Sequence, residues 1–188
     1  MAGDIPRTGG EPVTTTRIWE TWHEAINRAA WEAGVPAELL IATAATESRG
    51  REDQFLREEP GYQNDEATPQ LVSLGPCHVL LSTARWVMGD STINRAWLAE
   101  PENNFRAAAA LIAKQSKETG LDPPKVAAAY NAGSLRADDS PDNRWKMHCY
   151  PVHTGRHIDR FVSWYNDAAW VLKFSPLHAT VTMLPLFA

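Results

Sequence analysis

A glutamate at the end of an apolar run is the residue in this chain whose setting best suits catalysis. Glu47 lies near the end of the segment 36–48, whose composition predicts a helix. Leu40, Thr43 and Ala44 share its face of that helix by three- and four-residue spacing, so the carboxyl group points where buried side chains point. Burial favours the neutral carboxylic acid, and a neutral acid can donate the proton that glycosidic bond cleavage requires. The alternative is a helix-end glutamate whose carboxylate reaches solvent.

The elements that position this residue are predicted to be helices. Apolar periodicity and the placement of proline and glycine predict helices over residues 17–33, 36–48, 76–89, 101–119, 122–133 and 155–173. We find no internal repeat and no alternation strong enough to predict a sheet. The expected fold class is therefore all-α, or mainly α.

The chain divides into an arm, one domain and a tail. Residues 1–16 are rich in Gly, Pro and Thr and predict a flexible arm, whereas residues 17–174 form one domain. Residues 175–188 contain two prolines and predict an extended tail over the surface. Inside the domain, residues 50–72 are predicted to be a long loop and residues 134–154 to be irregular.

Composition excludes several classes of function. The net charge of −5 argues against a nucleic-acid surface, and no apolar run reaches the roughly 20 residues that span a bilayer. Residues 51–66 contribute much of the negative charge, with six acids against two arginines. The first residues lack a basic region followed by an apolar stretch, so we expect synthesis in a cytoplasm without a signal peptide.

Three short segments, in order, resemble the soluble lytic transglycosylase and goose-type lysozyme superfamily. They are Ala-Thr-Glu-Ser at 45–48, Ser-Leu-Gly-Pro-Cys-His at 73–78 with Leu-Ser-Thr-Ala-Arg at 81–85, and Ala-Tyr-Asn-Ala-Gly at 129–133. That family has a helix ending in Glu-Ser, a Gly-Leu-Met-Gln turn opening a helix with Thr-Ala-Arg, and a later Ala-Tyr-Asn-Ala-Gly. The resemblance covers residues 36–133, and the loop 57–62 is similar to versions carried by bacteriophages.

The resemblance implies a single lysozyme-like helical domain that cleaves peptidoglycan without a metal or cofactor. The bond is the β-1,4 linkage between N-acetylmuramic acid and N-acetylglucosamine. Glu47 would protonate the bridging oxygen and then accept the proton of the C6 hydroxyl, which gives a 1,6-anhydro product. The expected partners are peptidoglycan glycan strands and, for a phage enzyme, tail or virion proteins. Such an enzyme acts on the cell wall after release at lysis or from the virion.

The resemblance also implies the residues that bind substrate. They are Ser48, Tyr62, Ser73, His78, Tyr130 and Asn131. The Tyr130 hydroxyl would donate a hydrogen bond to Glu47 or to the sugar, and Asn131 would bind an acetamido group or brace Tyr130. Tyr62 would offer a sugar platform from the long loop. The alternative for Tyr130 is a core tyrosine, and that for Asn131 is a helix C-cap. The alternative for Tyr62 is an exposed loop residue without a role.

The chain departs from the family pattern where Gly-Pro-Cys-His at 75–78 replaces Gly-Leu-Met-Gln. His78 takes the glutamine position, and a charged imidazole beside Glu47 would weaken it as a proton donor. Cys77 and His78, with His148 and Cys149, suggest a zinc site. Adjacent ligands do not have the usual paired spacing, however, so we predict no metal. A disulfide between the two cysteines stays open.

Two other functions remain as alternatives. If a loop carboxylate faces Glu47 and activates water, the enzyme is a hydrolytic muramidase. The candidates are Asp53, Glu58, Glu59, Asp65 and Glu66. If these carboxylates are solvated instead, their negative charges would disfavour a further negative charge on Glu47 and so help to keep it protonated. The second alternative is an inactive structural tail subunit or wall-binding domain, suggested by His78 and by the apolar tail 181–187.

Overall fold

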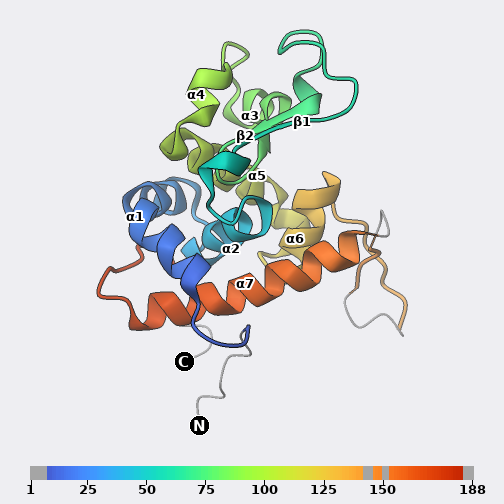
Figure 1. The fold of residues 1–188 in the computed structure, drawn as a ribbon. Helices are drawn as coiled ribbons and strands as arrows, with labels where there is room; N and C mark the ends of the chain where they lie inside the picture. Colours follow the sequence, from blue (N-terminus) through green and yellow to red (C-terminus); the bar gives the residue numbers. More distant parts are fainter. Residues whose placement is uncertain (1–7, 142–145, 150–152, 184–188) are drawn as a thin grey trace.

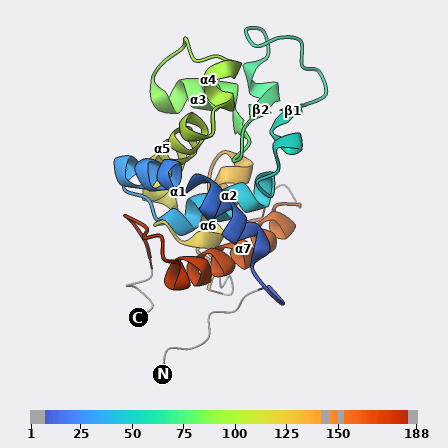
Figure 2. The same ribbon diagram turned by 60° about the vertical axis from the view of Figure 1, so that its left-hand side comes forward.

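The computed structural model describes residues 8–141, 146–149 and 153–183. Within these ranges the chain forms seven α-helices and one small antiparallel sheet (Figures 1 and 2). The helices are α1 (Val13–Ala33), α2 (Ala37–Glu47), α3 (Leu81–Met88), α4 (Arg95–Ala99), α5 (Pro101–Thr119), α6 (Pro123–Ala132) and α7 (Thr154–Phe174). The strands are β1 (Leu56–Glu58), β2 (Val72–Leu74) and β3 (Val79–Leu80). The mainly α prediction is confirmed.

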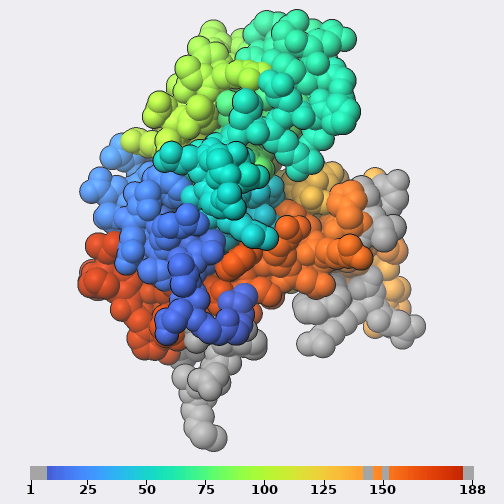
Figure 3. Space-filling view, viewed as in Figure 1, coloured from blue at the N-terminus to red at the C-terminus, as the bar shows by residue number. Residues whose placement is uncertain are grey.

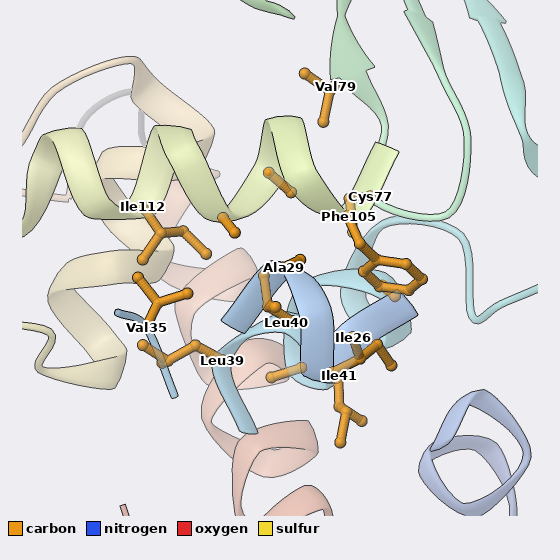
Figure 4. Close-up of a cluster of buried hydrophobic side chains, with 14 of the residues drawn as sticks. Ile26, Ala29, Val35, Leu39, Leu40, Ile41, Cys77, Val79, Phe105 and Ile112 are labelled. Carbon is orange, nitrogen blue, oxygen red and sulfur yellow. The ribbon is translucent and has the colours of Figure 1, made fainter. Parts of the chain in front are cut away.

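Helix α2 lies at the centre of the molecule. Its residues 37–46 are all buried, which is expected for a helix that is apolar on nearly every side. It packs between α1 and α7 and also contacts α5. Figure 4 shows Leu39, Leu40 and Ile41 of α2 among core side chains that include Ile26 of α1 and Phe105 of α5. The helix that ends in Glu47 is therefore fixed on all sides by packing.

The sheet is the largest departure from the sequence-based prediction. Strand β2 pairs with β1 and with β3, and Leu56 lies opposite Leu74 in the first pair. The strands have only two or three residues, so they are too short for alternation to reveal them. Strand β1 lies inside the segment 50–72, which we expected to be a loop without regular structure. Helix α4 was also not predicted.

Helix α3 begins later than predicted, at Leu81 rather than near Pro76. Residues 75–78 form a turn in which Gly75 has φ +72° and His78 has φ +45°. These left-handed conformations are incompatible with a right-handed helix. The turn brings the chain back so that β3 can pair with β2.

The elements form two lobes joined by α5 (Figures 1 and 2). The upper lobe contains the sheet, α3, α4 and the loop that follows β1. The lower lobe contains α1, α2, α6 and α7. Among the described residues, no helix is long and apolar enough to cross a membrane.

Both ends of the described chain pack on the lower lobe. Thr8 donates from its backbone N–H to Asp167 of α7 at 3.2 Å, and α1 already begins at Val13, so the arm is shorter than predicted. In the tail, Ala37 N–H donates to the carbonyl of Val181 at 2.8 Å. Residues 1–7, 142–145, 150–152 and 184–188 lie outside the described residues, so the division into a flexible arm, one domain and an extended tail stays a prediction.

Candidate active site

A cleft lies between the two lobes, and Glu47 lines it. Figure 3 shows the surface hollowed between the teal loop of the upper lobe and the tan and orange chain of α6 and α7. The lining residues come from both lobes: Glu47, Arg57, Glu59, Ser73, His78, Val79, Leu80, Thr83, Leu111, Tyr130, Asn131 and His153. The structure thus brings Glu47 together with four of the predicted substrate-binding residues.

Each carboxyl oxygen of Glu47 faces an imidazole. The Nδ1 atom of His78 lies 3.7 Å from Oε2, and the Nε2 atom of His157 lies 3.7 Å from Oε1. The carboxyl group is largely shielded, since the side chain of Glu47 is 17% exposed. At 3.7 Å the contacts are longer than a hydrogen bond, so they act through electrostatics in this geometry.

The contact between His78 and Gln54 fixes which imidazole nitrogen faces Glu47. Its Nε2 lies 2.5 Å from the carbonyl oxygen of Gln54, and a carbonyl can only accept, so Nε2 carries the proton. In the neutral ring the unprotonated Nδ1 therefore faces Oε2 of Glu47. This orientation places Nδ1, rather than the Nε2 atom held by Gln54, beside the carboxyl group.

His157 is the main site residue that sequence reasoning missed. It lies on α7 and is 8% exposed. Burial lowers its pKa most, the nearby charges of Arg160 and His153 lower it further, and Glu47 raises it. His157 is thus a neutral imidazole near pH 7. Its spacing is the missed signal, because positions 157, 161 and 165 share the buried face of α7.

Tyr130 braces the turn that carries His78. Its hydroxyl donates to the carbonyl of Cys77 at 2.8 Å, and its ring lines the cleft. Burial, followed by the neighbouring Cys77 and Glu47, raises the pKa of Tyr130 well above its ordinary value, so the phenol keeps its proton. In this geometry the hydroxyl serves the turn rather than Glu47.

Asn131 and Ser48 join elements of the site. The Asn131 side-chain amide donates to Oγ1 of Thr154 at 3.1 Å, which links α6 to the start of α7, and Asn131 also lines the cleft. Ser48 is 2% exposed and is not among the residues that line the cleft. Its hydroxyl donates to the carbonyl of Pro76 at 2.7 Å and accepts from Gly50 N–H at 3.0 Å. Ser48 thereby ties the end of α2 to the turn 75–78.

Ser73 and Tyr62 have different positions relative to the cleft. Ser73, on β2, is 6% exposed and lines it. Tyr62 is not among the lining residues. Its hydroxyl donates to Asp65 at 2.6 Å, and the guanidinium of Arg95 lies 5.0 Å from the centre of its ring. One face of Tyr62 is therefore already covered by a cation.

The loop carboxylates are paired with arginines. Arg51 binds Asp53, Arg57 binds Glu59, Arg85 binds Glu66, and Arg95 binds both Glu58 and Asp65, all at 2.6–2.7 Å. Their charges are largely offset by these partners, which weakens any collective repulsion on Glu47. Of these carboxylates, Glu59 lines the cleft, together with its partner Arg57.

The two cysteines lie in different environments. Cys77 is buried in the core and Cys149 is exposed, and both are free thiols. Burial raises the pKa of Cys77 well above its ordinary value, so this thiol stays protonated. Among the described residues, no three His, Cys, Asp or Glu side chains come together in a way that could hold a metal ion.

The sequence matches the transglycosylase SLT domain family over residues 24–146, which is more than half of the chain. The chain belongs to this family. The resemblance inferred from the three motifs is confirmed, and so is the lysozyme-like fold class. Membership implies a peptidoglycan-cleaving function of the lytic transglycosylase type, which is exerted on the cell wall. A comparison with curated proteins found no match. The family match ends before α7, so it does not include His157.

Proposed function

We propose that the protein is a lytic transglycosylase that uses Glu47 as its single catalytic carboxyl group. The substrate bond is the β-1,4 linkage between N-acetylmuramic acid and N-acetylglucosamine. The observation that carries the proposal is the position of Glu47 in the cleft between the lobes, with an imidazole facing each carboxyl oxygen. A carboxyl group that is shielded from solvent and lines a cleft is placed to give a proton to a substrate bound there.

The proposed reaction balances without water. Glu47 gives its proton to the bridging oxygen, the bond from that oxygen to C1 of the muramic sugar breaks, and positive charge develops at C1. The Glu47 carboxylate then accepts the proton of the C6 hydroxyl of the same sugar as O6 attacks C1. The products are a 1,6-anhydro-muramic end and a free 4-hydroxyl on the N-acetylglucosamine. Glu47 ends protonated, ready for the next cycle.

The other predicted residues take two kinds of role in this proposal. Ser73, His78, Tyr130 and Asn131 contact the sugars, because they line the cleft with Glu47. Ser48 is a positioning residue, because it bonds the turn 75–78. Tyr62 stays a predicted contact for strands long enough to reach the loop after β1.

Glu59 favours a second candidate function, that of a hydrolytic muramidase. It lines the same cleft as Glu47, so a water between them could be activated by its carboxylate. Its ion pair with Arg57, at 2.7 Å, competes with that role. We therefore favour the reaction with one carboxyl group.

The products of peptidoglycan digestion test both candidates. Wild type is expected to release muropeptides with 1,6-anhydro ends, each lighter by one water than the hydrolysed product in mass spectrometry. Glu47→Gln should lower the rate by about 10²–10⁴-fold, the usual contribution of a general acid. Glu59→Gln should leave the anhydro product unchanged.

Three outcomes would contradict parts of this proposal. If wild type released only hydrolysed products, and Glu59→Gln no longer released them, the protein would be a muramidase. Equal rates for wild type and Glu47→Gln would remove Glu47 from catalysis. Binding of walls without cleavage by wild type would support the inactive wall-binding domain.

We also propose that a phage supplies the protein, released at lysis or carried in the virion, because the loop 57–62 is similar to versions carried by bacteriophages. Mass spectrometry of purified virions distinguishes the two routes. Detection of the protein at a fixed copy number per particle would support carriage in the virion.

A further inference from the structure

An exposed aromatic ring held by a cation lies beside the cleft. Trp86 of α3 is 59% exposed. The ammonium group of Lys114, on α5, lies 5.0 Å from the centre of the indole ring. This is a cation–π contact between two helices that pack against each other. The contact holds Lys114 over the indole ring, although both side chains reach solvent.

Trp86 and Lys114 lie about one helical turn beyond residues that line the cleft, on α3 and α5 respectively. Thr83 comes three residues before Trp86 on α3, and Leu111 comes three residues before Lys114 on α5. Thr83 and Leu111 both line the cleft. Residues three apart lie on the same face of a helix, about 4.5 Å further along its axis. Trp86 and Lys114 therefore extend the same surface beyond the cleft.

The chemistry of the pair matches that of a peptidoglycan strand. The flat face of an indole packs against the C–H face of a pyranose ring, and Trp presents both an apolar face and a polar edge. The stem peptides on muramic acid carry carboxylates, which an ammonium group attracts. A polymeric strand lying in the cleft must continue past its ends, and a surface that continues the cleft lining is placed to meet it.

Position distinguishes Trp86 from Trp31, the other strongly exposed tryptophan among the described residues. Trp31 of α1 is 72% exposed but lies on the lower lobe, on a helix that contributes no residue to the lining of the cleft. Single exposed apolar side chains are normal on protein surfaces, so exposure alone carries no argument. The case for Trp86 rests instead on its continuity with Thr83 and Leu111 of the cleft lining and on its contact with Lys114.

We propose that Trp86 and Lys114 form an additional subsite for the peptidoglycan strand, where a sugar ring stacks on Trp86 and a stem-peptide carboxylate pairs with Lys114. This inference rests on the proposed function. It adds length dependence to substrate recognition, because short fragments fill the cleft without reaching Trp86.

Binding to the Glu47→Gln variant tests the aromatic part, because an uncleaved strand allows equilibrium titration. The probes are peptidoglycan glycan fragments of increasing length, measured by calorimetry. Adding Trp86→Ala should weaken binding of long fragments by about 3- to 10-fold, the range for one aromatic contact, and leave short fragments unchanged. Trp31→Ala is the matched control and should change binding at no length. Trp86→Phe should restore part of the affinity.

Lys114→Gln tests the charged part with a pair of probes. Fragments that carry stem peptides should bind about 2- to 5-fold more weakly to this variant, and part of the salt dependence should be lost. Glycan fragments stripped of peptide should bind as before. Equal losses for both probes would contradict the assignment of Lys114 to a peptide carboxylate.

The inference and the proposed function fail in different ways. If Trp86→Ala shows the wild-type dependence on fragment length, the subsite is overturned and the catalytic proposal stands. If wild type binds no fragment and cleaves no wall, both are overturned. Thermal unfolding of each variant, expected to be unchanged at these exposed positions, shows that the fold is intact.

Discussion

The two imidazoles that face Glu47 differ in how well the sequence reveals them. His78 stands in a motif and was assigned to the site from the motif alone. His157 lies in a helix that the family match does not reach, and it comes to Glu47 only because α7 packs against α2. A histidine on the buried stripe of a helix is most often a core residue. Only the packing of α2 on α7 shows that this one faces a carboxyl group.

The buried His157 predicts a dependence of stability on pH. Burial lowers its pKa below the ordinary 6.5 in the folded protein, whereas the unfolded chain keeps the ordinary value. Between these two values the unfolded chain binds a proton that the folded chain does not. Stability is therefore fully present above pH 6.5 and decreases as the pH falls towards the lowered pKa of His157. The free energy of unfolding should fall by about 1.4 kcal/mol for each pH unit that separates the two pKa values.

Urea unfolding of wild type and His157→Gln at several pH values measures this effect. The free energy of unfolding of wild type should fall more steeply below pH 6.5 than that of the variant, which has no group to titrate at this position. Parallel curves for wild type and His157→Gln would contradict the prediction.

At the scale of elements, the turn 75–78 decides where His78 points. Residues from three helices or their ends hold this turn by hydrogen bonds. Asn104 of α5 accepts from Cys77 N–H at 2.9 Å and donates to the carbonyl of Leu74 at 2.7 Å. Ser48, beside α2, and Tyr130 of α6 bind the carbonyls of Pro76 and Cys77. These partners are distant in sequence, which explains why local pattern predicted a helix here instead of a turn.

Long helices were predictable because their signals are local. Helix α5 has Pro101 in its first turn and Gly120 after its end, and the predicted and observed bounds agree. Helix α7 begins and ends within one residue of its predicted bounds. The short strands and the late start of α3 depend instead on pairing across the sheet and on Asn104. Sequence therefore predicted the helices that carry the site better than it predicted the upper lobe.

Gly75→Ala should destabilise the protein more than Gly120→Ala. Both glycines have positive φ, +72° and +62°, so alanine costs each about 1–2 kcal/mol of backbone strain. At Gly75 the added Cβ would also lie 2.4 Å from the side chain of Asn104, whereas at Gly120 it meets nothing within 4 Å. Moving Asn104 breaks buried hydrogen bonds, at about 1–3 kcal/mol for each group left unpaired.

Urea unfolding of the two variants gives the comparison, and wall cleavage adds a second readout. Gly120→Ala should keep wild-type turnover, because it lies at the end of α5 and not in the cleft lining. Gly75→Ala should lose turnover as well as stability, since the turn that holds His78 is displaced. Equal losses of stability would show that Asn104 does not confine the turn.

At the scale of the whole molecule, the C-terminal tail closes the lower lobe over the helix that carries Glu47. After α7 the chain passes beside α1, where Thr180 binds Asn27, and reaches the start of α2 (Figures 1 and 2). There Glu38, which is fully buried, accepts from Met183 N–H at 2.9 Å and from the Thr182 hydroxyl. One end of α2 is thus held by the tail, and its other end presents Glu47 to the cleft.

Two threonines of the tail offer a matched test of this closure. Thr182→Val removes a donor from the buried Glu38, and a buried polar group that loses its hydrogen bond costs about 1–3 kcal/mol. Thr180→Val removes an exposed contact with the backbone of Asn27 and should change stability by no more than about 0.5 kcal/mol. Urea unfolding measures both losses, and hydrogen exchange reports where they act. Amides of α2 should exchange faster in Thr182→Val than in Thr180→Val, because opening of the tail releases the start of that helix. Equal exchange of α2 in the two variants would mean that packing against α1 and α7 alone holds Glu47 in place.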